Sequence, residues 1–121
     1  MYERTDQQFF QDISESIHAA TDFVEGYDFA CFSKDRKTKS AVIRELEIVG
    51  EASSRISLDK KNEYPGVPWR LLKDFRNVLA HEYFGVNEEI VWDIVSNKLP
   101  ALKEQIDGIL KAELSTSGNS Q

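Results

Sequence analysis

The chain has 121 residues, of which 40% are hydrophobic and 30% are charged, and its formal net charge at pH 7 is −6. This length and composition are typical of one soluble domain with one core, and no run of about 18 apolar residues is present that would span a membrane. The polar, acidic start of the chain is unlike a secretory signal, and the single cysteine, Cys31, excludes an internal disulfide, so we expect a reducing, cytoplasmic location.

The first predicted helix begins at Thr5, which forms a capping-box pattern with Gln8, and ends near Gly26. Residues 27–38 are expected to form a connection that can hold one short helix, in which Cys31 is a partly buried residue without a catalytic role. His18 is expected to lie on the surface. The apolar side chains of this helix recur every three or four residues, at Phe9, Phe10, Ile13, Ile17, Ala20 and Val24.

The second predicted helix carries a wide apolar stripe, which favours contact with more than one neighbour. Its centre holds Gly50, which costs about 1 kcal/mol relative to Ala in a helix. Either a close helix–helix approach requires this glycine, or the fold simply tolerates it. The basic segment 34–39 before the stripe is either a local basic patch or a solvated start of the helix. The stripe comprises Val42, Ile43, Leu46, Ile48, Val49, Ala52, Ser53 and Ile56.

Two more helices complete the prediction. Residues 59–66 are turn-like, and Pro68 is suited to the first turn of a third helix, whose core face is Leu72, Phe75 and Leu79. Gly85 then interrupts the chain. Asn87 caps the fourth helix, which Pro100 should kink. The core side of the fourth helix is Val91, Val95, Leu102, Ile106 and Ile109.

No segment alternates with a period of two, so the sequence predicts an all-α fold. The expected architecture is an antiparallel four-helix bundle with at most one short extra helix. Residues 1–113 are expected to form the domain. Residues 114–121 carry too little apolar surface to be ordered by packing, and a disordered tail is expected there.

The cluster of side chains with obvious catalytic chemistry is Arg76, His81 and Tyr83. On one regular helix, Tyr83 would lie about 20° from Arg76, whereas His81 would lie about 140° away. Arg76 and His81 are therefore poorly placed to act as neighbours on one helix. Either the helix ends near His81, or the site combines residues of two chains related by a dimer axis.

These residue types suit cleavage of a phosphodiester beside a ribose 2′-hydroxyl. A histidine can transfer the protons, and an arginine can hold the phosphate through paired hydrogen bonds. The pattern contains no cluster of metal ligands, so no metal or other cofactor is expected. The simpler interpretation is structural: Arg76 forms a surface ion pair with Asp74 or Glu82, and His81 interacts with the dipole at a helix C-terminus.

The segment RNVLAHEYFGVN, residues 76–87, together with Val49-Gly50-Glu51-Ala52, resembles the HepT-like branch of the HEPN superfamily. The resemblance extends over residues 5–112. It implies an all-helical homodimer in which the motif helices meet across the interface. It also implies a metal-independent endoribonuclease toxin that cleaves RNA and is paired with a nucleotidyltransferase antitoxin of the MntA type.

The resemblance assigns a role to each motif residue. Arg76 would bind and polarise the phosphate, His81 would be the acid and base, and Asn77 would orient the site. Tyr83 would receive AMP from the antitoxin. Glu51 would be a supporting residue, although an ion pair with Arg76 or Arg44 also explains it. The net charge of −6 keeps a second function open, a non-catalytic module that binds a nucleotide or the nucleotidyltransferase.

Overall fold

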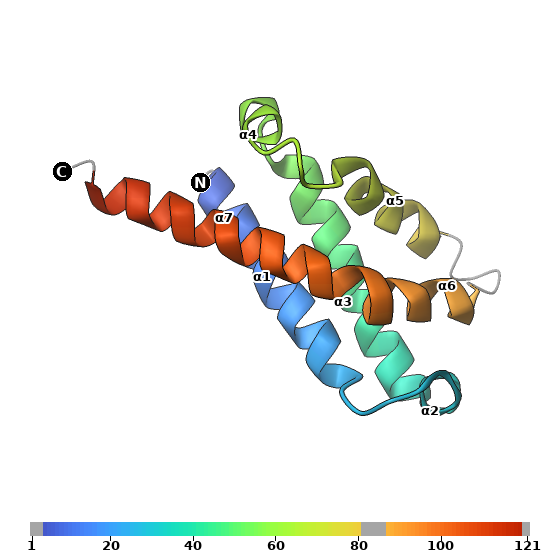
Figure 1. Cartoon of the computed structure of the whole chain (residues 1–121). Helices are drawn as coiled ribbons and strands as arrows, with labels where there is room; N and C mark the ends of the chain where they lie inside the picture. The colour runs from blue at the N-terminus through green and yellow to red at the C-terminus, as the bar shows by residue number, and fades with distance from the viewer. Residues whose placement is uncertain (1–3, 81–86, 120–121) are drawn as a thin grey trace.

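The computed structural model describes the backbone of residues 4–80 and 87–119, and the side chains of residues 4–76 and 87–115. Every regular element in these ranges is helical, which confirms the predicted all-α bundle (Figure 1). None of these helices is long and apolar enough to cross a lipid bilayer. The four long helices are α1 (Asp6–Phe23), α3 (Arg36–Arg55), α5 (Trp69–Ala80) and α7 (Leu99–Asn119).

The ends of α1 follow from its sequence. The Thr5 side chain accepts a hydrogen bond from the Gln8 backbone, and the Gln8 side chain accepts one from the Thr5 backbone, so the predicted capping box is present. After the helix, Gly26 has a φ of +80°. This left-handed conformation is open to glycine at little steric cost, and it turns the chain toward α2 (Phe29–Lys34).

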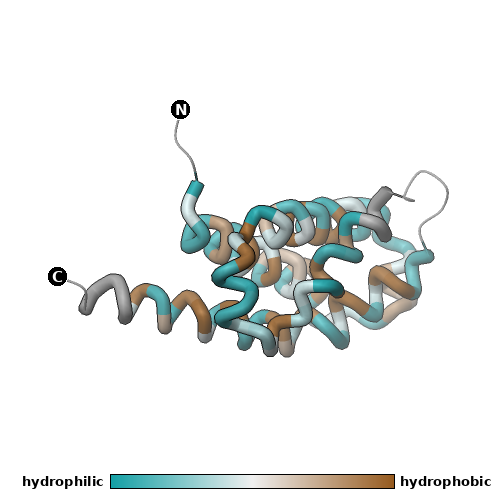
Figure 2. The backbone as a smooth tube through the Cα atoms, turned by 90° about the horizontal axis from the view of Figure 1, so that it is seen from above, coloured by the Kyte–Doolittle hydropathy of each residue, from teal (hydrophilic) through white to brown (hydrophobic). Residues whose placement is uncertain are grey.

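The core is built around α1, which packs on both α3 and α7, while α5 packs on α3 (Figure 1). Hydrophobic and hydrophilic stretches alternate along the long helices (Figure 2). Helix α3 packs on both α1 and α5, which confirms the prediction of more than one neighbour. The largest fully buried side chains are Phe10, Ile13, Ile17, Phe32, Val42, Leu46, Val49, Leu72, Phe75, Leu99, Leu102 and Ile106.

A second short helix, α4 (Leu58–Glu63), forms where the sequence predicts a turn. Its N-cap is Ser57, whose backbone N–H and hydroxyl donate to the Asp6 carboxylate at 2.9 and 2.7 Å. Asp6 lies 51 residues earlier in the chain, so this anchor is a tertiary contact. Within the described residues, α2 and α4 are therefore two short helices outside the four predicted main helices, where the sequence predicts at most one.

The last part of the described chain begins with α6 (Glu88–Asp93), which Asn87 caps as predicted by accepting a hydrogen bond from the Glu89 backbone. A π-helical turn, η2 (Ile94–Lys98), joins it to α7 at the place where a kink is predicted. Pro100 lacks the N–H that a regular α-helix needs there, and a wider turn accommodates that loss. Helix α7 continues to Asn119, beyond residue 113, and the boundary between domain and tail stays a prediction.

Two side chains outside the motif differ from expectation. His18 lies only half on the surface, because its Nε2 is 2.8 Å from Asp107 Oδ2 on α7. Burial raises the pKa of Asp107, but hydrogen bonds from Ser14 and His18 outweigh it, and the net pKa is lowered. These polar contacts tie α1 to α7. Cys31 is exposed rather than partly buried, whereas its neighbour Phe32 is fully buried in the core.

Candidate functional site

Helix α5, in which the motif begins at Arg76, packs chiefly against α3. Leu72 and Phe75 on α5 are buried, as the sequence predicts for the third helix. The two helices lie close together at Gly50 of α3. A Cβ atom added at Gly50 would lie 2.6 Å from Arg76 Cγ and 3.3 Å from both Arg76 N and Leu72 O. Gly50 is therefore required by a close approach, which decides between the two predicted explanations.

From this contact, the Arg76 guanidinium extends to Glu51 on α3. Its Nη2 is 3.4 Å from Glu51 Oε2, and half of the Arg76 side chain is exposed. Glu51 also pairs with Arg55 of its own helix at 3.0 Å, whereas Arg44 pairs with Glu47. The structure thus brings Arg76 and Glu51 together and excludes Arg44 as the partner of Glu51.

This ion pair is weak enough to open. Both side chains are about half exposed, and exposed pairs contribute only about 0–1 kcal/mol to stability. The predicted alternative partner, Asp74, forms no ion pair with Arg76 in the part of the chain whose side chains are described. Arg76 is accordingly a solvent-facing cation that an anionic ligand can recruit.

The other motif residues are placed only in part. Asn77 lies in α5, but its side chain is outside the described residues. His81, Glu82 and Tyr83 also lie outside the described residues. The predicted roles of Asn77, His81 and Tyr83, and the relation of Arg76 to His81, therefore stay predictions.

Two neighbouring cavities in the described part of the chain are lined partly by α5, and their charges differ. A cavity of about 570 Å³ opens between α3, α4 and the start of α5, and it has three cationic residues and one acid. Its lining consists of Ser53, Ser54, Lys61, Trp69, Arg70, Lys73 and Asp74. The predictions from the sequence do not include this cluster, because its cations come from two separate helices. The signal available was Arg70 and Lys73 beside Trp69, one or two turns before Arg76.

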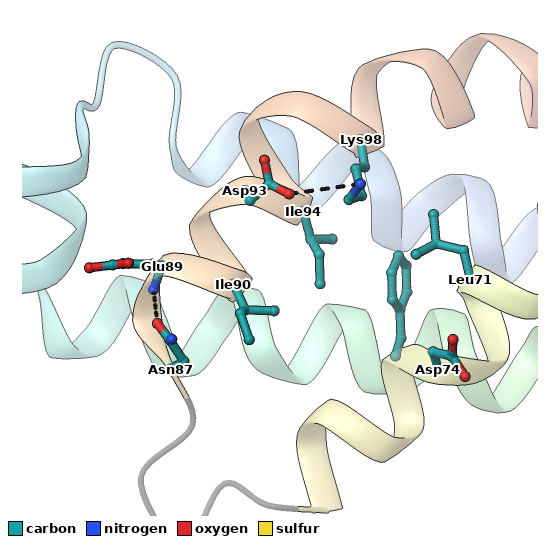
Figure 3. A pocket seen from close by; sticks show the side chains of 9 residues that line it. Leu71, Asp74, Asn87, Glu89, Ile90, Asp93, Ile94 and Lys98 are labelled. Atoms are coloured by element: carbon teal, nitrogen blue, oxygen red, sulfur yellow. Dashed lines mark hydrogen bonds and ion pairs between the residues drawn. The ribbon is translucent and has the colours of Figure 1, made fainter.

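The second cavity, of about 290 Å³, lies between α5 and the α6–η2 segment (Figure 3). Leu71, Ile90 and Ile94 give it an apolar floor. Three acids line it, against one lysine, Lys98, which is 3.8 Å from Asp93. A polyanion would therefore be repelled from this cavity.

The fold and the site define a class of protein: a helical bundle in which an arginine and a glutamate pair across two packed helices. The family whose model matches the chain is described as Ribonuclease HepT-like, and the match covers residues 13–109. The chain belongs to this family, which confirms the resemblance seen in the motif.

Named relatives agree with this assignment. The chain is 46% identical to "Putative RNase MJ0127" of Methanocaldococcus jannaschii, over 85% of each chain. It is 39% identical to "Probable ribonuclease HepT" of Thermococcus cleftensis, over 89% of this chain and 98% of the relative. It is 33% identical to "Putative RNase TTE0752" of Caldanaerobacter subterraneus, over 91% and 98%. No solved structure matches the chain significantly.

Proposed function

We propose that the protein is an endoribonuclease that needs no metal ion and uses Arg76 and His81 as its catalytic residues. The observation that carries the proposal is the half-exposed guanidinium of Arg76, held at the α3–α5 contact by a weak ion pair, in a chain of the HepT-like ribonuclease family. An arginine in this setting can exchange its carboxylate partner for a phosphate.

The reaction that fits these residues is an internal transfer. His81 takes the proton of the ribose 2′-hydroxyl, and the 2′-oxygen attacks the adjacent phosphorus. The bond from phosphorus to the 5′-oxygen breaks, and that oxygen receives a proton from a protonated histidine that acts as the general acid. Arg76 donates hydrogen bonds to the phosphoryl oxygens, where negative charge grows in the transition state. Asn77 orients the groups, and Glu51 holds Arg76 before RNA arrives.

The spacing of the motif supports a site shared by two chains. On a continuous helix, His81 would lie about 140° around the axis from Arg76. Helix α5 is also held by one main neighbour, α3, so its outer side is not enclosed within the described chain. We propose a homodimer in which Arg76 of one chain acts with His81 of the other.

Complementation tests this arrangement. Arg76→Ala and His81→Ala chains should each cleave RNA far more slowly than wild type in the presence of a chelator. Mixed dimers, isolated through two affinity tags, should regain activity because one of their two clefts retains both side chains. Replacing the other histidine, as His18→Gln, is the matched control and should leave the rate unchanged.

The outcomes separate the alternatives. Mixed dimers as inactive as their parents would reject a site shared between chains. A wild-type chain that cleaves no RNA would reject the nuclease and favour the module that binds a nucleotide or a nucleotidyltransferase. RNA cleavage that persists in the His81→Ala protein would show that His81 is not a catalytic residue.

We further propose that the protein is the toxin of a toxin–antitoxin pair and that an MntA-type nucleotidyltransferase inactivates it by attaching AMP to Tyr83. Tyr83 follows Arg76 by seven residues, so on a continuous helix the two would lie about 20° apart. The phosphodiester of an attached AMP would carry negative charge to the Arg76 guanidinium and compete with RNA phosphate.

Intact-mass analysis after co-expression with the nucleotidyltransferase tests this regulation. We expect an added mass of one or more AMP groups that maps to Tyr83 and is absent from Tyr83→Phe protein. Modified protein should cleave RNA more slowly than unmodified protein. Equal cleavage rates would refute the inhibitory role, and an adduct on another residue would refute the site.

A further inference from the structure

We propose that the basic cavity between α3, α4 and α5 binds the RNA strand that flanks the cleaved phosphate. We call it the α4–α5 groove and define it by the residues that line it: Ser53, Ser54, Lys61, Trp69, Arg70, Lys73 and Asp74. The inference rests on the proposed ribonuclease function and adds to it a binding surface, whose ligand is the sugar–phosphate backbone of single-stranded RNA.

The groove begins beside the candidate catalytic arginine. Lys73 precedes Arg76 by three residues on α5, and Ser54 follows Glu51 by three residues on α3. Three residues correspond to about 4.5 Å along a helix axis. Because both walls continue from the Arg76–Glu51 pair, a strand with one phosphate at Arg76 can place its neighbouring phosphates in the groove.

The charges of the groove are available to a ligand. Arg70 and Lys73 are exposed, and within the described side chains Lys61, Arg70 and Lys73 take part in no ion pair. Many cations elsewhere are neutralised, such as Lys39 by Glu88 and Lys60 by Glu63 and Glu113. The chain is acidic as a whole, but the groove is locally basic, since Asp74 is its one acidic residue.

Trp69 gives the groove a fixed wall. Its indole Nε1 donates to the Tyr64 carbonyl at 3.0 Å, and its ring lies 6.1 Å from that of Phe10. Lys61 Nζ is 5.9 Å from the Trp69 ring centroid, at a distance where a cation is attracted to the ring. The ring therefore positions Lys61 over the cavity without neutralising it. This arrangement suits phosphate binding without a preference for base sequence.

The neighbouring acidic cavity, which shares Asp74 with the groove, limits the path of the strand. It is lined by Asp74, Glu89 and Asp93 with only Lys98 as a cation, and Lys98 is already near Asp93 (Figure 3). RNA bound at Arg76 is thus repelled by one of these two neighbouring cavities and attracted by the other.

The salt dependence of RNA binding tests the groove. In a His81→Ala background, which prevents cleavage, the combined substitutions Lys61→Gln, Arg70→Gln and Lys73→Gln should weaken binding of a labelled single-stranded oligoribonucleotide of mixed sequence. If each cation contacts one phosphate, the slope of log K against log salt should become shallower by about 2. In the cleaving chain, KM should rise while kcat stays near that of the unsubstituted protein.

The chain offers a matched control at the other end of α3. Lys34, Arg36 and Lys37 are also two lysines and one arginine, all exposed, and within the described residues none forms an ion pair. Helix α3 has 20 residues, so its ends are about 30 Å apart. Changing these three to Gln removes the same charge but should leave the slope nearly unchanged.

Each result decides the proposal. A shallower slope for the groove variant alone supports it. Equal losses in both triple variants, or an unchanged slope in the groove variant, would overturn it and point to general charge attraction or to another partner for the groove. Lys73→Gln alone gives the same test if the triple variant does not fold. A wild-type chain without cleavage would refute the proposed function, whereas the slopes would still decide the groove.

Discussion

Replacing Arg76 with Ala is expected to lower the rate of RNA cleavage by about 10²–10³-fold, as the loss of one donor to a developing oxyanion does in other enzymes. The fold should persist, because the side chain is half exposed and its ion pair with Glu51 is weak. Cleavage rates under saturating RNA, together with the midpoint of urea unfolding, check both parts of the prediction.

Arg55 provides the matched control for Arg76. It pairs with the same carboxylate, Glu51, at 3.0 Å and is similarly exposed, but it lies on α3 outside the motif. Arg55→Ala should therefore cleave RNA at nearly the wild-type rate. Arg76→Lys should be intermediate, since lysine keeps the charge but loses the paired hydrogen bonds. Equal losses for Arg55→Ala and Arg76→Ala would reject a specific role for Arg76.

Replacing Gly50 with Ala should weaken both the fold and the activity. The new methyl group would lie 2.6 Å from Arg76 Cγ and 3.3 Å from two backbone atoms of α5, so rotation of the Arg76 side chain alone cannot relieve the contact. Overpacking of this kind costs about 1–3 kcal/mol, against a gain of about 1 kcal/mol in helix propensity. Arg76 must move with α5, and cleavage should fall with it. Gly50→Val should be worse in both respects.

Gly108 is the control for this substitution. It lies exposed on α7, where an added Cβ would meet nothing within 4 Å. Gly108→Ala should raise the free energy of unfolding by up to about 1 kcal/mol through helix propensity and leave cleavage unchanged. If Gly50→Ala were as stable and active as Gly108→Ala, the close α3–α5 approach would not be needed to position Arg76.

Much of this fold can be predicted from the sequence, because its long helices bury continuous stripes. The stripe from Val42 to Ile56 predicts α3 correctly, since each of its turns contributes a buried side chain. Helix α4 cannot be predicted in this way. Leu58 at its start is 72% exposed, so the segment has no stripe. Ser57 caps it locally, but the contact that anchors Ser57 to Asp6 is one that no local pattern reveals.

The site is predictable to a smaller degree. The Arg76–Glu51 pair and the close approach at Gly50 are both among the expectations from the sequence, and the structure confirms them. The α4–α5 groove is not, because Lys61 joins Arg70 and Lys73 only after α4 folds against α5. An overall charge of −6 also hides a local excess of cations. The roles of His81 and Tyr83 in the site remain predictions.

The double pairing of Glu51 has a consequence for turnover. When Arg76 turns toward a phosphate, Glu51 still has Arg55 beside it, so no carboxylate loses its only partner. The exchange needs only rotation of exposed side chains, which takes picoseconds to nanoseconds rather than a movement of the backbone. The same carboxylate can recapture Arg76 as the bond to the phosphate loosens. We expect this recapture by Glu51 to speed the release of the cleaved strand, so that tight binding of RNA does not lead to slow release of the product.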